Sequence, residues 1–267
     1  MIVQHNIASM NANRQLGIVG NNLSKATEKL SSGYRINRAA DDAAGLSISE
    51  KMRGQIRGLN RASDNAQDGI SLIQTAEGAM DQQHAILQRA RELAVQAAND
   101  TNVTEDRNAI SEELAQLKAE FDRITTQTEF NTQKLCNGSF KSKHFQVGAN
   151  QEQSIEVTIA KTEMTDISSK VGTYSKATAA INTINGNITA LSTTRSKLGA
   201  IQNRLEYTVK NDDNASENIQ NAESRIRDVD MADEMTRFSK ESILQQAATS
   251  MLAQANQQNQ GVLSLLQ

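Results

Sequence analysis

Apolar residues recur along most of this chain at alternating steps of three and four positions, which is the spacing of one face of an α-helix. Residues 1–30 carry such a seam, which continues through Leu16, Val19, Leu23 and Leu30 between polar residues. A lone helix of this length is only marginally stable in water. The pattern therefore predicts an N-terminal helix whose apolar face must pack against something else.

Two more helices are predicted next along the chain. Apolar residues keep a heptad step from about Leu46 to Asn99, a stretch that as one helix would extend for about 75 Å. A polar cluster at residues 99–102 ends this helix, and Thr104 begins another that runs to about Thr128. Helices of this length are typical of bundles and coiled coils.

The period of the pattern changes after Phe130. Residues 144–148 (HFQVG) and 154–160 (SIEVTIA) alternate in polarity and contain β-branched side chains. Residues 149–152 separate the two runs and supply turn-forming types. This arrangement predicts a small β-hairpin.

Helical spacing returns from Tyr174 to Thr208, although Asn185-Gly186 is a turn signal that would interrupt this helix. The last part of the chain, residues 214–267, carries a second lone seam. The simplest way to cover both lone seams is to pair the two terminal helices antiparallel, with further copies of the chain covering what remains exposed. The residues predicted to drive self-assembly are Leu16, Val19, Leu23, Leu30, Leu244, Met251, Val262 and Leu265.

The stretch from Ser31 to Glu50 interrupts the helical pattern and is called the joint below. Its Gly33 can end a helix, and its short polar residues favour turns and helix starts. Its charged side chains offer ion pairs within the joint or between subunits, so we expect Asp42→Ala to alter assembly more than folding. The predicted joint residues are Gly33, Arg35, Arg38, Asp41 and Asp42.

The composition favours long helices over a thick globular core. The 267 residues include no Pro and no Trp, and only 3% are aromatic, so few large side chains are available to fill an interior. The sequence therefore predicts a mostly α fold, an elongated antiparallel bundle or coiled coil of long helices with a small β-hairpin.

Neither the charges nor the reactive side chains indicate a catalytic or metal site. The net charge of -3 is spread over interleaved acids and bases, without the basic block expected for nucleic-acid or membrane-surface binding. His5, His84 and His144 lack the spacing of metal ligands. No secretory signal or membrane-spanning run occurs, and a single cysteine, Cys136, excludes an intrachain disulfide. We expect neither enzymatic activity nor a cofactor.

Four segments of the chain resemble bacterial flagellin. They are LSSGYRINRAADDAAGLSISEKMRGQIRGL (residues 30–59), QRARELAVQAAND (88–100), EFDRITTQTEFN (120–131) and SILQQAATSMLAQANQQNQGVLSLLQ (242–267). The resemblance implies a secreted, extracellular subunit that polymerises into the flagellar filament for swimming motility after type III export. It also implies a helical homopolymer as the main partner, together with an export chaperone and a cap protein.

The same resemblance implies a division of the chain into inner domains, with a very short central region where many flagellins insert outer domains. The N- and C-terminal halves of a filament-core domain would be residues 1–42 and 229–267. The helices of a rod domain would be residues 43–140 and 188–228, and the central region with the hairpin would be residues 141–187.

Flagellins of this kind include ligands of Toll-like receptor 5, which binds the first long helix of the rod domain and the helix after it. Here Arg89, Leu93 and Glu113 match the central contacts, and Arg89 and Leu93 are four residues apart on one predicted helix. The residues predicted to contact the receptor are Gln88, Arg89, Leu93, Val95, Gln96 and Glu113.

Two alternatives remain at this point. A flagellar hook-filament junction protein shares the terminal design, but the continuous match through both rod helices favours the filament subunit. A coiled-coil scaffold would form a stable dimer without a polymer.

Overall fold

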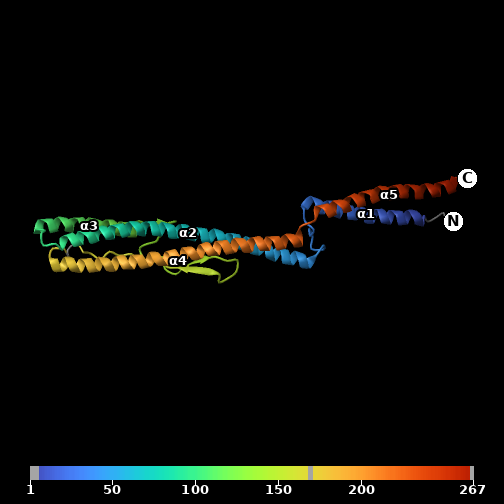
Figure 1. Cartoon of the computed structure of the whole chain (residues 1–267). Helices are drawn as coiled ribbons and strands as arrows, with labels where there is room; N and C mark the ends of the chain where they lie inside the picture. The colour runs from blue at the N-terminus through green and yellow to red at the C-terminus, as the bar shows by residue number, and fades with distance from the viewer. Residues whose placement is uncertain (1–5, 168–170, 265–267) are drawn as a thin grey trace. The chain divides into compact units, whose positions relative to one another are not determined.

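The computed structural model describes residues 6–167 and 171–264, with side chains up to residue 257. Long α-helices dominate these residues (Figure 1). The helices are α1 (Ile7–Ser32), α2 (Ala43–Ala97), α3 (Thr104–Gln127), α4 (Tyr174–Arg227) and α5 (Met231–Ser264). The strands are β1 (Glu129–Phe130), β2 (Gln133–Lys134), β3 (Lys143–Gln146) and β4 (Ser154–Val157). The predicted mostly α fold with long helices and a small hairpin is confirmed.

The chain divides into two compact units. The terminal unit contains residues 1–54 and 218–267, and the central unit contains residues 55–217. The unit boundaries therefore lie inside α2 and α4, whereas the expected domain limits at 42/43 and 228/229 lie at or next to helix ends. The five-part division of the chain stays a prediction.

In the central unit, α2 and α4 run antiparallel. The Ser63 hydroxyl donates to Asp213 Oδ1 at 3.0 Å, while farther along α2 the side chain of Asp81 pairs with Arg195 at 3.1 Å. The residue number thus increases along α2 while that of its contact on α4 decreases. Helix α2 also buries small side chains, among them Ala66 and Ala76. Small residues allow neighbouring elements to pack closely, so a chain poor in aromatics can still build a dense core.

Helix α3 and the segments after it complete this core. Phe121 and Leu114 of α3 are fully buried, as are Leu135 and Cys136 just after β2. The buried Gln83 side chain donates to Thr125 Oγ1 at 2.9 Å, so this part of the core also contains polar contacts that are hydrogen-bonded.

The predicted hairpin is confirmed as β3 paired antiparallel with β4, where Phe145 lies opposite Ile155. Gly58 of α2 explains how the hairpin loop approaches the helix, because a Cβ atom there would lie 2.8 Å from the Cβ of Ala149. Any larger residue at position 58 would push the loop away.

A second, smaller hairpin was not predicted. Strands β1 and β2 pair through Phe130 and Gln133, and the two residues between them, Asn131 and Thr132, have φ of 45° and 62°. Two successive positive φ values indicate a type I′ turn, which Asn favours. Thr is an unusual residue in the second turn position, so the sequence signal was weak.

The predicted interruption of the fourth helix at Asn185-Gly186 is wrong. Helix α4 continues through both residues, and no atom outside the helix backbone lies within 4 Å of the position where Gly186 would carry a Cβ. Glycine costs a helix interior about 1 kcal/mol relative to alanine. Burial of Ile184 and Leu191 on either side offsets that local preference.

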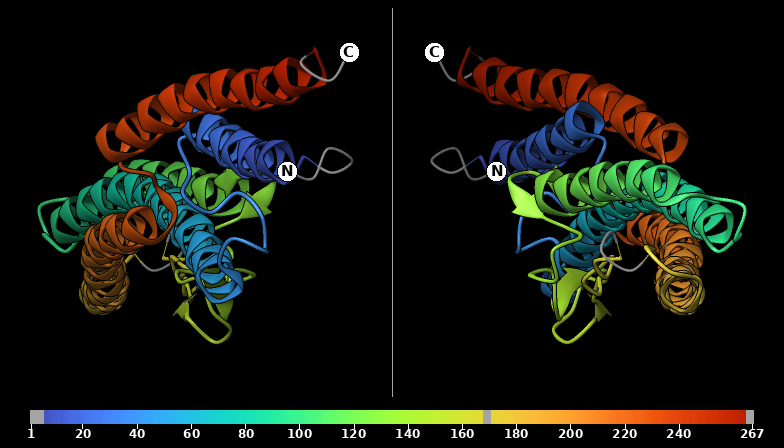
Figure 2. Two further views of the ribbon diagram at one scale, coloured as in Figure 1. Left: turned by 90° about the vertical axis from the view of Figure 1, so that its right-hand side faces the viewer. Right: turned by 90° about the vertical axis from the view of Figure 1, so that its left-hand side faces the viewer.

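In the terminal unit, α1 and α5 lie side by side (Figures 1 and 2). The Asn6 side chain donates to the carbonyl of Ala255 at 2.9 Å, and at the other end the Val229 N–H donates to the Gly33 carbonyl at 3.0 Å. The start of α1 is therefore near the later part of α5, which confirms the predicted antiparallel pairing of the two terminal helices.

We predict that Phe121→Ala lowers the free energy of unfolding by about 3 to 5 kcal/mol, because it removes a fully buried aromatic ring and leaves a cavity. Urea unfolding of the full chain, followed by helical circular dichroism, measures this loss. The matched control is Val103→Ala, where the side chain is 57% exposed and the expected loss is below about 0.5 kcal/mol. Equal losses in the two variants would contradict the assigned core.

Candidate functional site

Helix α1 ends where the joint begins, at Gly33. This residue has φ of 74°, and its N–H donates to the Lys29 carbonyl at 2.9 Å. Such a left-handed conformation closes a helix and is strained for residues with a side chain. The predicted role of Gly33 as the helix-ending residue fits this geometry.

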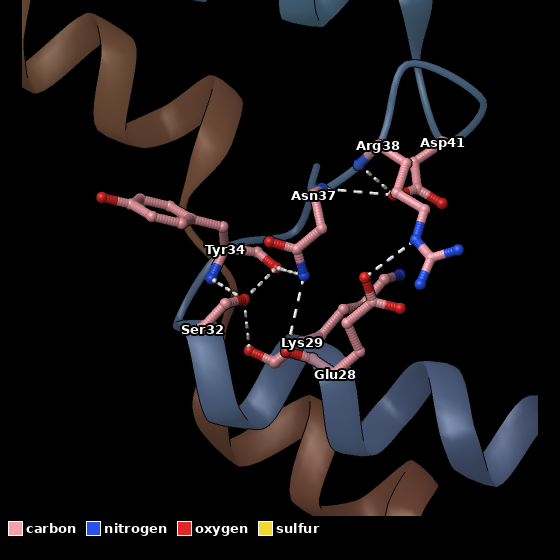
Figure 3. Close-up of polar contacts among 7 residues, drawn as sticks. All are labelled: Glu28, Lys29, Ser32, Tyr34, Asn37, Arg38 and Asp41. Carbon is pink, nitrogen blue, oxygen red and sulfur yellow. Dashed lines mark hydrogen bonds and ion pairs between the residues drawn. The ribbon is translucent and has the colours of Figure 1, made fainter.

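Asp41 organises the first turn after α1 (Figure 3). Its Oδ2 atom accepts hydrogen bonds from the N–H groups of Arg38 at 2.9 Å and Asn37 at 3.2 Å. The bond from Arg38 is the main cause that lowers the pKa of the Asp41 carboxyl. The Asn37 amide in turn reaches the carbonyls of Glu28 and Tyr34 at 3.4 and 3.5 Å. The joint is thereby folded back onto the last turn of α1.

Asp42 begins the next helix. Its Oδ1 atom accepts the N–H of Gly45 at 2.8 Å, which is a side-chain cap at the start of α2. Ile36 is 1% exposed and packs beside this cap, since a Cβ on Gly45 would lie 2.9 Å from its Cδ1 atom. One apolar side chain and one carboxylate thus fix where α2 starts.

The charged joint residues do not form the mutual pairs that the sequence suggested within the joint. Arg38 pairs with Glu28 of α1 at 3.0 Å, while Asp41 and Asp42 bind backbone N–H groups. Short carboxylates reach nearby backbone amides more readily than they reach a distant guanidinium. Pairing of these charges between subunits stays a prediction.

A second segment, residues 226–230, lies against the joint. The expected domain limit at 228/229 falls within this segment, but its contact with the joint was not predicted. The Arg35 N–H donates to the Arg227 carbonyl at 2.7 Å, and Tyr34 and Asp228 form an antiparallel β-bridge. The Arg35 guanidinium also donates to the Ile226 carbonyl. After this segment Asp230 caps the start of α5 by accepting the N–H of Ala232 at 2.9 Å.

These segments and helices α1 and α5 enclose a hollow of about 430 Å³ with charges of both signs. Lys25, Lys29 and Arg35 line it together with Asp230 and Asp233. Among the side chains that the structure describes, no group of histidine, cysteine and acidic residues is arranged to hold a metal ion.

The predicted self-assembly residues separate into two groups on the terminal helices. Leu16, Val19, Leu23 and Leu30 on α1 are half-buried, whereas Leu244 and Met251 on α5 are 40% and 66% exposed. The face of α5 toward α1 instead contains Phe238, Ala248, Leu252 and Ala255, which are less exposed. The side chains of Val262 and Leu265 lie outside the described residues.

The exposed apolar side chains on α5 form a stripe. Ile243, Ala247 and Met251 are four residues apart and all exposed, so they share one helix face. On α1, Ile7, Met10 and Ile18 are also exposed. Within the described part of the chain, no helix is both long and apolar enough to cross a membrane.

The predicted receptor-contact residues lie on α2 and α3 of the central unit. The Arg89 Nε and Nη2 atoms donate to Glu113 Oε1 at 3.0 and 2.9 Å, and this bond raises the pKa of Arg89 above its usual value. Gln88, Val95 and Gln96 are exposed on the same helix.

The prediction of Leu93 as a surface contact is wrong for this structure. Its side chain is 2% exposed and belongs to the core of the central unit, because it lies on the buried side of α2 next to Ala94. The spacing of four residues from Arg89 places the two near one another along the helix without exposing both.

Two protein-family descriptions match most of the chain. The bacterial flagellin N-terminal helical region matches residues 3–141, and the bacterial flagellin C-terminal helical region matches residues 181–266. A flagellin of Halalkalibacterium halodurans is 57% identical over 271 aligned residues that cover 100% of both chains. A flagellin of Bacillus subtilis is 47% identical over 303 residues, again with 100% of both chains covered.

Solved structures show related folds. The crystal structure of Bacillus cereus flagellin has a TM-score of 0.51 and 27% identity, and the match covers 56% of this chain and 88% of that one. A putative flagellar hook-associated protein from Vibrio parahaemolyticus has a TM-score of 0.61 over 70% of this chain and 100% of its own, with 10% identity. At that identity the likeness concerns the fold alone.

We predict that Asp41 titrates below the ordinary aspartate pKa of about 3.9. A carboxylate whose pKa is lowered in the folded state stabilises that state above its unfolded pKa, and the contribution disappears as the pH falls through the folded pKa. The backbone amide NMR signals of Asn37 and Arg38 should report this titration. Asp41→Asn should abolish it, and the control Asp68→Asn, an exposed aspartate on α2, should leave it in place. A midpoint at or above 3.9 would contradict the assigned hydrogen bonds.

Proposed function

Because this chain belongs to the bacterial flagellin family, we propose that its terminal unit packs against the terminal units of other copies to form the core of a flagellar filament. As a flagellin, the chain is a structural subunit of the extracellular flagellar filament, and motility is the function of that filament. The family is one of structural proteins, and we propose that the chain has no enzymatic activity.

One observation supports this use of the terminal unit more than any other. Among its described side chains, Ala26 and Ile36 are the fully buried apolar residues, whereas the central unit contains a continuous core that extends from Ala66 to Leu205. Two paired helices with so little buried surface gain little stability on their own. Contacts with other copies would supply the missing burial.

The exposed stripe on α5 supplies a chemically suitable surface for those contacts. Burying a Met or Ile side chain is worth about 1.5 to 3 kcal/mol, so Ile243 and Met251 together favour association. The apolar positions on α1 differ from those on α5, and contacts between unlike surfaces generate an open helical polymer when the rotation does not close. A closed dimer, which a coiled-coil scaffold requires, would not need these two exposed surfaces.

The hook-filament junction protein is the weaker alternative. Its support is the likeness to the putative hook-associated protein, which is 10% identical and therefore informs on fold alone. The flagellin of Halalkalibacterium halodurans, in contrast, aligns over 100% of both chains. Full-length similarity favours the filament subunit.

We further propose that the chain reaches the filament by type III export, with a flagellar export chaperone and a cap protein as partners. Two features suit passage through a narrow channel. The chain contains no Pro and a single Cys, so neither slow prolyl isomerisation nor an intrachain disulfide constrains its unfolding and refolding. A terminal unit with little core is also a suitable binding segment for a chaperone before assembly.

Recognition of the central unit by Toll-like receptor 5 is a separate proposal. Gln88, Arg89, Gln96 and Glu113 are exposed polar residues, and the apolar Val95 is exposed on the same helix as Arg89. Beside it, α3 forms a shallow hollow of about 480 Å³ lined by Glu113, Leu117 and other side chains. An arginine next to a partly apolar hollow is a common centre of protein-protein interfaces.

We predict that Met251→Asp prevents polymer growth and leaves the soluble chain folded, because it places a charge in a stripe that only other copies cover. Seeded growth followed by light scattering and electron microscopy measures the effect. The matched control is Gln246→Asp on an exposed position of the same helix outside the stripe, which should still polymerise. Normal filaments from Met251→Asp would contradict the assignment of this stripe to the subunit interface.

We predict that Arg89→Ala weakens receptor binding about 30-fold or more, as expected for loss of about 2 kcal/mol at the centre of an interface. Binding of the soluble full chain to the receptor ectodomain and a cell reporter assay provide the measurement. Arg91→Ala removes an exposed arginine from the same helix and serves as the control. Equal responses from the Arg89 variant and the unmodified chain would refute the proposal.

A further inference from the structure

Arg227, the last residue of α4, contacts two other segments of the terminal unit, residues 34–35 and an early turn of α2. Its Nη1 atom donates to Glu50 Oε1 of α2 at 2.7 Å, and its guanidinium carbon lies 4.8 Å from the centre of the Tyr34 ring. Its carbonyl accepts the N–H of Arg35 at 2.7 Å. One residue thus joins the end of α4, residues 34–35 at the start of the joint and Glu50 at its end, in an early turn of α2.

The guanidinium of Arg227 is shielded from water more than its carboxylate partner is. Its side chain is 14% exposed, whereas Glu50 is 49% exposed. Exposed pairs contribute between about 0 and 1 kcal/mol, but partial burial reduces screening by water. The hydrogen bond from Arg227 is also the main cause that lowers the pKa of the Glu50 carboxyl, with Arg53 contributing at 3.3 Å.

Backbone contacts beside Arg227 hold the same two segments together. Tyr34 and Asp228 form the antiparallel bridge, and the Val229 N–H donates to Gly33. These bonds join residues 33–34 at the start of the joint to residues 228–229 but do not reach α2. The Arg227 side chain connects this short pairing to α2 through Glu50. Without that side chain, the backbone bridge would have no such connection to α2.

We propose that Arg227 is the positioning residue of the joint: it fixes the end of α4, the joint and the first turns of α2 in one arrangement, and this arrangement sets the form of the polymer. A planar guanidinium can bind a carboxylate and stack on an aromatic ring at the same time. A lysine ammonium at the same position is a compact point charge and can replace the ion pair better than the stacking. The position of residue 227 therefore requires an arginine, because a lysine would keep the ion pair and lose the stacking on Tyr34.

The effect on polymer form rests on the proposed function, whereas the effect on the joint itself does not. Two measurements on the full chain keep them separate. Hydrogen exchange with mass spectrometry reads the peptides that contain the N–H groups of Arg35 and Val229, in the soluble chain and in the polymer. Electron microscopy reads the helical form of the polymer.

The variants are Arg227→Gln, Glu50→Gln and Arg227→Lys, with Arg225→Gln as the matched control. Arg225 is an exposed arginine two residues earlier on α4, so its loss changes net charge equally. We expect exchange of both peptides to accelerate roughly five- to tenfold in Arg227→Gln and Glu50→Gln, because the local opening equilibrium loses one charged hydrogen bond. The double variant Arg227→Gln/Glu50→Gln should show little more acceleration than either single variant. Arg227→Lys should exchange more slowly than Arg227→Gln.

Polymers of Arg227→Gln should differ in helical form from those of the unmodified chain while urea unfolding of the central unit stays unchanged. Equal exchange in Arg227→Gln and the unmodified chain, in both the soluble and polymeric forms, would overturn the proposal. Equal acceleration in Arg225→Gln would overturn it as well, since the effect would then be one of charge alone. Faster exchange with an unaltered polymer form would refute the role in setting that form. Failure of the unmodified chain to polymerise would count against the proposed function, and exchange in the soluble chain would still decide whether Arg227 positions the joint.

Discussion

The burial of narrow apolar stripes on long helices is the interaction on which both units depend. In the central unit three helices and two hairpins supply enough partners, so that Leu87 of α2 and Leu198 of α4 reach almost complete burial. In the terminal unit α1 and α5 pack along one another, and a single neighbour covers only one side of a helix. The same helical pattern thus produces a fully buried core in the central unit and leaves apolar surface exposed in the terminal unit.

Most of the fold could be predicted from the sequence because long helical periodicity is a repeated signal. The limits of α2 and α3 and the pairing of β3 with β4 follow from apolar spacing and from polar clusters between elements. Gly186 shows the opposite case, in which a local turn signal is overridden by burial on both sides of it. Short features such as the turn at Asn131 and Thr132 have too few residues to establish a pattern.

The joint was located from the sequence, but its contacts were not. Gly33 and Asp42 act locally, on a helix end and a helix start, and such roles depend on residue type and position alone. Arg227 and Glu50 lie 177 residues apart, and nothing in a single sequence pairs them. Leu93 likewise shows that helical spacing relates residues to one another but does not decide which face is buried. Contacts between distant segments require the three-dimensional arrangement.

Cys136 has a consequence for a polymer that works outside the cell. Extracellular surroundings are oxidising, and an accessible thiol on every subunit would allow neighbouring chains to become covalently cross-linked. In this chain the thiol is 0% exposed, and burial raises its pKa to about 11, so the reactive thiolate is scarce at neutral pH. The single thiol of each subunit is therefore unreactive, and the contacts between subunits can remain noncovalent and reversible.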